Sequence, residues 1–220
     1  MKILSVNVAL PEDIEYHGQV LNTSIFKRPV QGPVNVHCTH LAGDRQASQD
    51  VHGGEHKAVY LYSHDHYPWW CEKLGLPRLN WGQFGENLTV ADVLEPDLCI
   101  GDRLRTGSVL LEISGPRIPC QKLALRFGNP AMPGEFTASQ RCGFYLRVLA
   151  TGTVQRGQTL IREPAARPGP SVLEFFRAYT RPRSTGAREI LERASTLDSL
   201  DPALKPAIVK RLNALENSEP

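Results

Sequence analysis

Short runs of alternating apolar and polar residues, separated by glycine, proline and aspartate, fill the chain from Met1 to about Glu163. In the first run Leu4, Val6 and Val8 share one face, as in a strand with one buried side. Strands this numerous and this closely spaced favour a closed or nearly closed sheet over alternating βαβ units. We therefore predict a mainly β (α+β) fold with a barrel-like core. Further strands are expected at Gln19–Ile25, Val34–His40, Lys57–Tyr62, Asn87–Val93, Arg103–Arg105, Val109–Ser114, Tyr145–Ala150 and Thr159–Arg162.

Helical patterns are few before residue 163 and dominate after it. One helix is expected from Tyr67 or Pro68 to Lys73, with Gly75 as its C-terminal cap. A linker rich in proline, glycine and alanine then leads to Ser171-Val-Leu-Glu, which has the spacing of a capping box. Three helices this short bury little apolar surface alone, so they should lean on the barrel or on another chain. The predicted divisions are a barrel domain at 1–163, a linker at 164–170 and a three-helix domain at 171–220, with helices after Ser171, at Ala187–Ser195 and at Pro206–Leu215.

Charge, hydropathy and cysteine content indicate which partners and which cell compartment to expect. The formal net charge of +2 gives no reason to expect a nucleic-acid polymer as partner. No apolar run approaches the roughly 18 residues that a membrane span needs. The cysteines are odd in number, irregularly spaced and without a CxxC pair, which favours a reduced, cytoplasmic protein. They are Cys38, Cys71, Cys99, Cys120 and Cys142.

One of these cysteines, Cys120, stands in the segment RIPCQKL between a predicted strand and a short predicted helix, Lys122–Phe127. Unpaired backbone N–H groups at a helix N-terminus, together with the nearby Arg117 and Lys122, favour a thiolate over a thiol. A thiolate is a nucleophile or a soft metal ligand. The alternative is that Cys120 is simply a small buried hydrophobic residue.

Histidines offer a second set of candidates. His52 lies in DVHGGEHKAV, where two glycines allow the backbone to approach an anionic ligand closely. The same glycines interrupt a helix, which disfavours a zinc site made by His52 and His56. The alternative is a turn that enters the next strand. In the predicted strand Val34–His40, His37 and His40 would point to opposite faces, so a solvated face is favoured over a metal site there.

Polar residues at strand entries complete the candidate set. Asn87 in FGENLT is either an amide donor to a ligand or part of a tight turn. Lys27 either lines a pocket or lies on the surface, and Arg141 either binds an anion or caps a loop. Arg147 is expected to be solvated. Several cations together with one thiolate indicate an anionic ligand close to sulfur.

Six segments, in their order along the chain, resemble the MOSC domain, named for the C-terminal domain of molybdenum cofactor sulfurases. They are GDRQ, DVHGGEHKAVYLY, FGENLT, the IGD at Ile100–Asp102, PRIPCQKL and RCGFYLRV. The resemblance covers Met1 to Glu163 and is greatest to the bacterial YiiM-like branch, whose members also carry a C-terminal three-helix domain. It implies a MOSC-type β-barrel with a pocket for the molybdenum–molybdopterin cofactor.

The resemblance also implies roles for individual residues. Cys120 takes the position of the cysteine that ligates molybdenum, and Lys27, His52, Asn87 and Arg117 lie in or near the cofactor pocket. His52, whose charge changes near neutral pH, is the expected proton donor beside Cys120.

The activity implied by the resemblance is reduction of N-hydroxylated compounds, such as hydroxylaminopurine bases and amidoximes. The related mitochondrial amidoxime-reducing component belongs to the same reductase group. The sequence carries no cysteine-rich segment for an iron–sulfur cluster and no GxGxxG fingerprint, so we expect a separate electron-transfer protein to supply electrons.

Two other functions stay open at this point. In one, the chain is a carrier of sulfur or of the cofactor, and Cys120 bears a persulfide or passes the cofactor on. In the other it is a metal-free thiol hydrolase that pairs Cys120 with a histidine. The helices after Ser171 either pair two chains as a homodimer or cover the mouth of a pocket, and their sequence does not decide between these roles.

Overall fold

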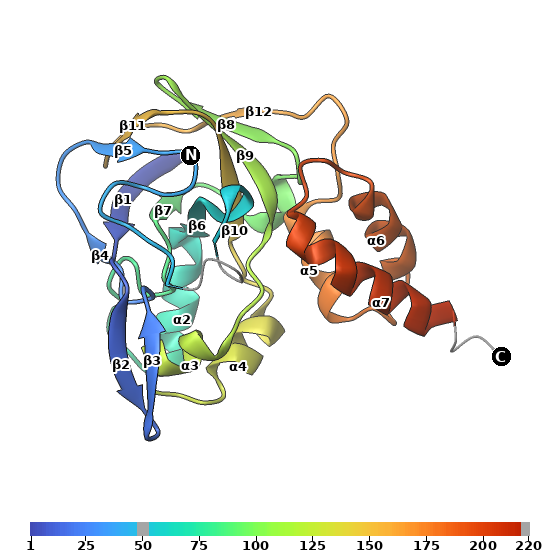
Figure 1. Cartoon of the computed structure of the whole chain (residues 1–220), viewed down its shortest axis with the longest axis horizontal. Helices are drawn as coiled ribbons and strands as arrows, with labels where there is room; N and C mark the ends of the chain where they lie inside the picture. The colour runs from blue at the N-terminus through green and yellow to red at the C-terminus, as the bar shows by residue number, and fades with distance from the viewer. Residues whose placement is uncertain (48–52, 217–220) are drawn as a thin grey trace.

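An eight-stranded sheet, curled into a half-barrel, forms the body of the molecule (Figure 1). The computed structural model describes residues 1–47 and 53–216. Neighbouring strands are antiparallel except for the parallel pair β6 and β7. The strands, in sheet order, are β12 (Ile161–Glu163), β8 (Arg103–Thr106), β9 (Val109–Pro116), β10 (Phe144–Ala150), β6 (Val59–Ser63), β7 (Leu88–Ala91), β1 (Lys2–Val8) and β4 (Arg28–Pro29).

Hydrogen bonds between the two ends of the sheet bring the barrel close to closure. The Ile3 amide donates to the Gln158 carbonyl at 2.9 Å, and the Leu160 amide donates to the Met1 carbonyl at 2.9 Å. These bonds hold the chain just before β12 against β1, near the opposite edge of the sheet. The predicted, nearly closed β-rich core is therefore confirmed.

Smaller elements decorate this core. A two-stranded sheet joins β5 (Val34–Val36) to β11 (Gly152–Val154), and the hairpin of β2 (Glu12–Tyr16) and β3 (Gln19–Thr23) projects from one end (Figure 1). The helices among the strands are α2 (Tyr67–Leu74), α3 (Gln121–Phe127) and α4 (Met132–Ser139), with short 3₁₀ turns η1 (Glu55–Lys57), η2 (His64–His66) and η3 (Glu95–Asp97).

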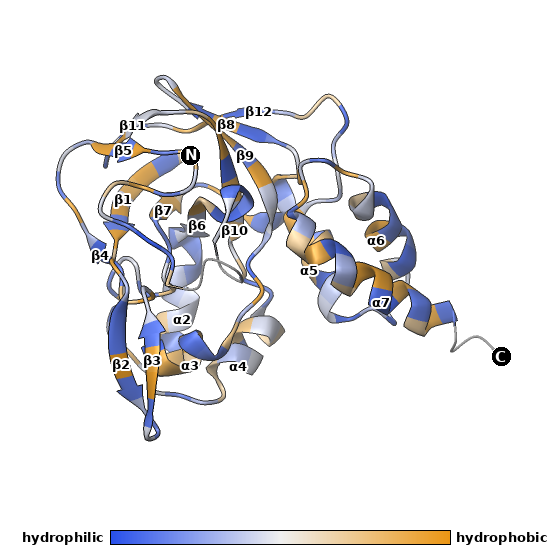
Figure 2. Ribbon diagram, in the orientation of Figure 1, coloured by the Kyte–Doolittle hydropathy of each residue, from blue (hydrophilic) through white to orange (hydrophobic). Residues whose placement is uncertain are grey.

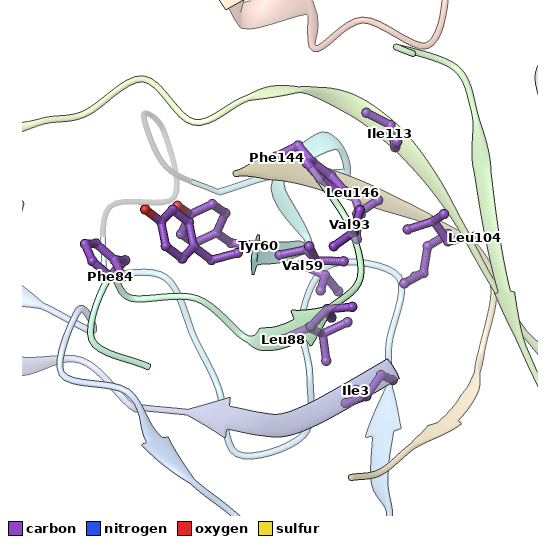
Figure 3. Packing of buried hydrophobic residues seen from close by; sticks show 14 of the residues in the cluster. Ile3, Val59, Tyr60, Phe84, Leu88, Val93, Leu104, Ile113, Phe144 and Leu146 are labelled. Atoms are coloured by element: carbon purple, nitrogen blue, oxygen red, sulfur yellow. The ribbon is translucent and has the colours of Figure 1, made fainter. Parts of the chain in front are cut away.

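The main hydrophobic core fills the inside of the curled sheet (Figure 3). Ile3, Leu88 and Ile113 enter it from β1, β7 and β9, and none of the three is exposed. Apolar and polar residues alternate from Leu4 to Val8 of β1 (Figure 2), as the sequence predicts for a strand. The expected buried face of Leu4, Val6 and Val8 is wrong in part, because the register shifts between Ile3 and Ser5: Ile3 and Val6 are buried, and Leu4 and Val8 only partly so. Full burial of each such aliphatic side chain stabilises the fold by about 1.5–3 kcal/mol.

Three helices and a short turn follow the barrel and lie against one side of it (Figure 1). They are α5 (Val172–Thr180), α6 (Ala187–Ser195), η4 (Pro202–Leu204) and α7 (Lys205–Glu216). Phe175 of α5 belongs to a second core with α6 and α7, whereas Phe176 belongs to the barrel core. The helices therefore lean on the barrel through α5, as their short length requires. Their division into a separate domain, and a homodimer built through them, stay predictions.

Local signals of helix ends were reliable. The Ser171 amide donates to the Glu174 carboxylate at 2.8 Å, and the Glu174 amide donates to the Ser171 hydroxyl at 3.2 Å, so the capping box is confirmed. Gly75 ends α2 in the left-handed conformation at φ 64°. None of the helices that the structure describes is both long and apolar enough to span a membrane.

Three predicted strands were too long, and several elements were missed. The strand predicted at Gln19–Ile25 ends at Thr23, and the one predicted at Asn87–Val93 covers only Leu88–Ala91. The strand predicted at Val34–His40 ends at Val36, because the chain turns where the His37 amide donates to the His40 carbonyl at 2.9 Å. The two imidazole rings consequently lie 4.9 Å apart instead of on opposite faces. The unpredicted elements are β2, β4, β11 and α4.

Candidate functional site

Cys120 stands between β9 and α3, at the strand-to-helix position that the sequence predicts. It is a free, partly exposed cysteine and lines an open cavity with about 620 Å³ of space, the adjoining solvent included. The backbone of residues 117–120 leaves the sheet after Pro116, and the Leu123 amide then donates to the Cys120 carbonyl at 3.0 Å to begin the helix. The sulfur is therefore not sealed in hydrocarbon packing.

A buried ion pair forms one wall of this cavity. The Lys27 ammonium contacts the Asp44 carboxylate, and both side chains are almost completely buried. The carboxylate is also held by the backbone amide of Ala9 at 2.9 Å. Burial lowers the pKa of the Lys27 ammonium, and the contact with Asp44 opposes that change. Lys27 is thus a fixed cation and not a mobile surface lysine.

Asn87 lines the same cavity, but its side-chain amide forms hydrogen bonds with other protein groups. Its Nδ2 donates to Asp44 Oδ2 at 2.9 Å and to the Asn7 carbonyl at 3.2 Å, while its Oδ1 accepts from the Tyr60 amide at 3.0 Å. Asn87 therefore fixes the carboxylate that holds Lys27. Direct contact between Asn87 and a cofactor stays a prediction.

Arg117 brings a second buried cation, from the loop that carries Cys120. The residue is 6% exposed, its guanidinium donates to the Phe84 carbonyl, and its Cζ lies 4.9 Å from the centre of the Tyr60 ring. Within residues 1–47 and 53–216, no carboxylate forms an ion pair with it. A buried guanidinium without an acidic partner is costly. The buried positive charge therefore favours binding of an anion in this cavity.

The remaining predicted residues lie elsewhere or outside the described ranges. His52 belongs to the part of the chain that the structure does not describe. Arg141 stacks over Trp69, with its Cζ 4.1 Å from the ring centre, and Arg147 pairs with Glu112 at 2.5 Å. Neither arginine is among the described residues that line the cavity.

The donor set fits a molybdenum–molybdopterin cofactor. Nowhere in the described ranges do three side chains of histidine, cysteine, aspartate or glutamate gather into a metal site. A metal at Cys120 would therefore take this one soft thiolate from the described protein and its other ligands from an organic cofactor. Lys27 and Arg117 would face the anionic groups of that cofactor.

Sequence reasoning gave no role to several residues that line the cavity, and three of them are charged or aromatic. Asp44 stands in the GDRQ segment, and Lys57 and Tyr145 stand in two of the other quoted segments, yet none was assigned a role. All three line the cavity together with Cys120. The signal was their place inside these segments, but their convergence depends on the packing of segments that are distant in the sequence.

Comparison with known proteins identifies the family of this chain. A family model described as "MOSC domain" matches residues 48–161. "Uncharacterized protein YflK" of Bacillus subtilis is 42% identical over 158 residues, which are 72% of this chain and 71% of that protein. A protein of Gibberella moniliformis named "Reductase" is 39% identical over 163 residues, 73% of this chain but only 29% of that much longer protein.

Among solved structures, the fold is similar to the crystal structure of YiiM from Geobacillus stearothermophilus. The TM-score is 0.79 at 28% sequence identity, and the match covers 96% of this chain and 98% of that one. The similarity thus includes the helices after the barrel as well as the barrel itself.

Proposed function

Because the chain belongs to the MOSC domain family and is YiiM-like within it, we propose that it is a molybdenum-cofactor-dependent reductase of N-hydroxylated compounds. The relative named "Reductase" supports a reductive activity. The observation that carries the proposal is the arrangement at one cavity of a partly exposed Cys120 and the buried cations Lys27 and Arg117.

The described side chains would hold the cofactor both at its metal and at the anionic groups of its pterin. Cys120 ligates molybdenum through its thiolate, which is suited to a soft metal–sulfur centre. Lys27, kept in place by Asp44 and Asn87, and Arg117, kept in place by Phe84 and Tyr60, neutralise the anionic groups of the pterin. Fixed cations of this kind need no rearrangement when the ligand binds.

The proposed reaction converts R–NHOH, two electrons and two protons into R–NH₂ and water. When bound, the cofactor would supply the two electrons needed to break the N–O bond. A separate electron-transfer protein restores the electrons, and His52 stays the proposed source of a proton. The organic substrate is a small molecule that reaches the partly exposed Cys120 from solvent.

The proposal is tested with wild-type protein, Cys120→Ser and the control Cys38→Ser, all produced in cells that make molybdopterin. Cys38 is exposed and does not line the cavity. We expect Cys120→Ser to lose molybdenum and to reduce hydroxylaminopurine more than about a hundredfold more slowly, since even the outer partners of metal ligands contribute 10- to 100-fold. The measurements are elemental analysis and turnover with an artificial electron donor.

Other outcomes would separate the alternatives. If Cys120→Ser keeps both molybdenum and turnover, the assignment of Cys120 is wrong. Fully metal-loaded wild-type protein without turnover would favour a carrier of the cofactor or of sulfur. Full activity on an ester or thioester after molybdenum is withheld would favour a thiol hydrolase.

A further inference from the structure

A second cavity opens beside the first, and Cys120 lines both. This second cavity has about 640 Å³ of space, the adjoining solvent included, and shares Lys57, Ile118, Cys120 and Tyr145 with the first. Its remaining described walls are the end of β9 at residues 114–116, Pro119, and two residues from the C-terminal region, Asp201 and Leu204. The candidate metal ligand thus stands where two compartments meet.

The two compartments differ in chemistry. Lys27 and Arg117 line only the first, whereas only the second has Pro116, Pro119 and Leu204 in its wall. Its charged groups are Lys57 and Asp201, which pair at 3.1 Å. An anionic cofactor therefore matches the first compartment, and the second suits a flat organic molecule that presents an N–H donor to a carboxylate.

Asp201 is held firmly as an acceptor. Its backbone amide donates to the Ser114 carbonyl at 2.9 Å, and its Oδ1 accepts from the Ala203 amide at 3.0 Å. An ionised carboxylate has about four acceptor positions, so Lys57 and Ala203 leave room for a further donor from a ligand. The side chain needs no reorientation to receive it.

The wall that carries Asp201 approaches the barrel closely. At Gly115, where φ is +148°, a Cβ atom would lie 3.2 Å from Leu204 Cδ1. A glycine at this position lets η4 sit against the end of β9 and close the compartment. The C-terminal segment, outside the residues matched by the family model, therefore completes the cavity.

We propose that the second cavity is the substrate compartment, and that Asp201 selects N-hydroxylated compounds with an additional N–H donor, such as amidoximes and aminopurine derivatives. This inference rests on the proposed function for its substrate class.

The test compares wild type with Asp201→Asn and Leu204→Trp, and uses Asp198→Asn as a control. Asp198 is exposed, belongs to the same segment and does not line the cavity. The probes are benzamidoxime as substrate and benzamidine, the planar cation that its reduction yields, as ligand. Benzamidine binding is followed by equilibrium dialysis, also on metal-free protein, and molybdenum content is measured on every variant.

We expect Asp201→Asn to weaken benzamidine binding and to raise the KM for benzamidoxime by about tenfold or more, because hydrogen bonds to a charged group contribute roughly 1.5–3 kcal/mol. Leu204→Trp fills the compartment while the Lys57–Asp201 pair remains, so it should block benzamidine. Both variants should keep wild-type molybdenum content, and Asp198→Asn should match wild type throughout.

The inference is overturned if wild-type protein does not bind benzamidine, or if benzamidine binding is unchanged in both Asp201→Asn and Leu204→Trp. Parallel loss of molybdenum in Asp201→Asn would also overturn it, because Asp201 would then act on the cofactor side. Failure of the proposed function looks different: metal-loaded wild type would bind benzamidine in the Asp201-dependent manner but would not reduce benzamidoxime.

Discussion

The two compartments that meet at Cys120 are built in different ways. The first is made by the barrel and its loops, with the buried Lys27–Asp44 pair fixed by Asn87 and a second buried cation at Arg117. The second is closed by Asp201 and Leu204, which belong to the segment between α6 and α7. Binding of an anionic cofactor needs charges held rigidly in a stable core, whereas a substrate compartment can be finished by a segment at its edge. Substitutions in the two compartments should therefore have separable effects.

The largest effect is expected from breaking the buried ion pair of the first compartment. Lys27→Met leaves the Asp44 carboxylate buried without its cation, which should lower the free energy of unfolding by about 3–5 kcal/mol. The double variant Lys27→Met/Asp44→Asn should recover a large part of this loss, because no charge is then stranded. Urea denaturation of the three proteins provides the measurement. A loss below 1 kcal/mol for the single variant would mean that the pair contributes little to the rigidity of this wall.

A smaller effect on stability is expected at Gly115, which packs against Leu204 in the wall of the second compartment. Gly115→Ala places a Cβ 3.2 Å from Leu204 Cδ1 at a backbone conformation that side chains rarely adopt, so it should cost roughly 1–3 kcal/mol of stability. It should also raise the KM for benzamidoxime while molybdenum content stays at the wild-type level. These are measured by thermal unfolding, steady-state kinetics and elemental analysis.

Gly134→Ala is the matched control for that substitution. Gly134 is exposed in α4, has no positive φ, and nothing lies within 4 Å of the position of its added Cβ. The change should stabilise the protein slightly, by about 0.5–1 kcal/mol, and leave KM unaltered. Equal shifts of KM in both glycine variants would remove the distinction between the two compartments.

The smallest effect concerns pH at the junction between the barrel and the C-terminal segment. Burial lowers the pKa of His56 below its ordinary 6.5, and the nearby Arg147 acts in the same direction. Between that lowered pKa and 6.5 the unfolded chain binds more protons than the folded protein, so stability should rise with pH across this window and level off above it.

His56→Gln should remove this part of the rise, because glutamine does not titrate. Urea midpoints measured from pH 4.5 to 8 for wild type and His56→Gln provide the check. The difference between the two proteins should change below pH 6.5 and be constant above it. An unchanged slope in the variant would show that burial of His56 does not contribute to the pH dependence.

Signals that act over a few residues were read correctly from the sequence. The alternation in β1, the capping box at Ser171 and the bounds of α6 each depend on neighbouring side chains and backbone groups. The position of Cys120 between a strand and a helix follows from the same short-range patterns. The overlong prediction at Val34–His40 failed because a turn at His37 overrode the local preference for a strand.

The sequence by itself determined a β-rich chain with helices at its end, one cysteine at a strand-to-helix junction and a set of cations near it. Only the tertiary structure decided which of those cations face the sulfur. Lys27, Asp44 and Asn87 meet through side-chain contacts across separations of 17 and 43 residues, and Asp201 reaches the cavity because η4 packs on the end of β9. Contacts between segments so far apart depend on the packing of the whole chain, which no local pattern encodes.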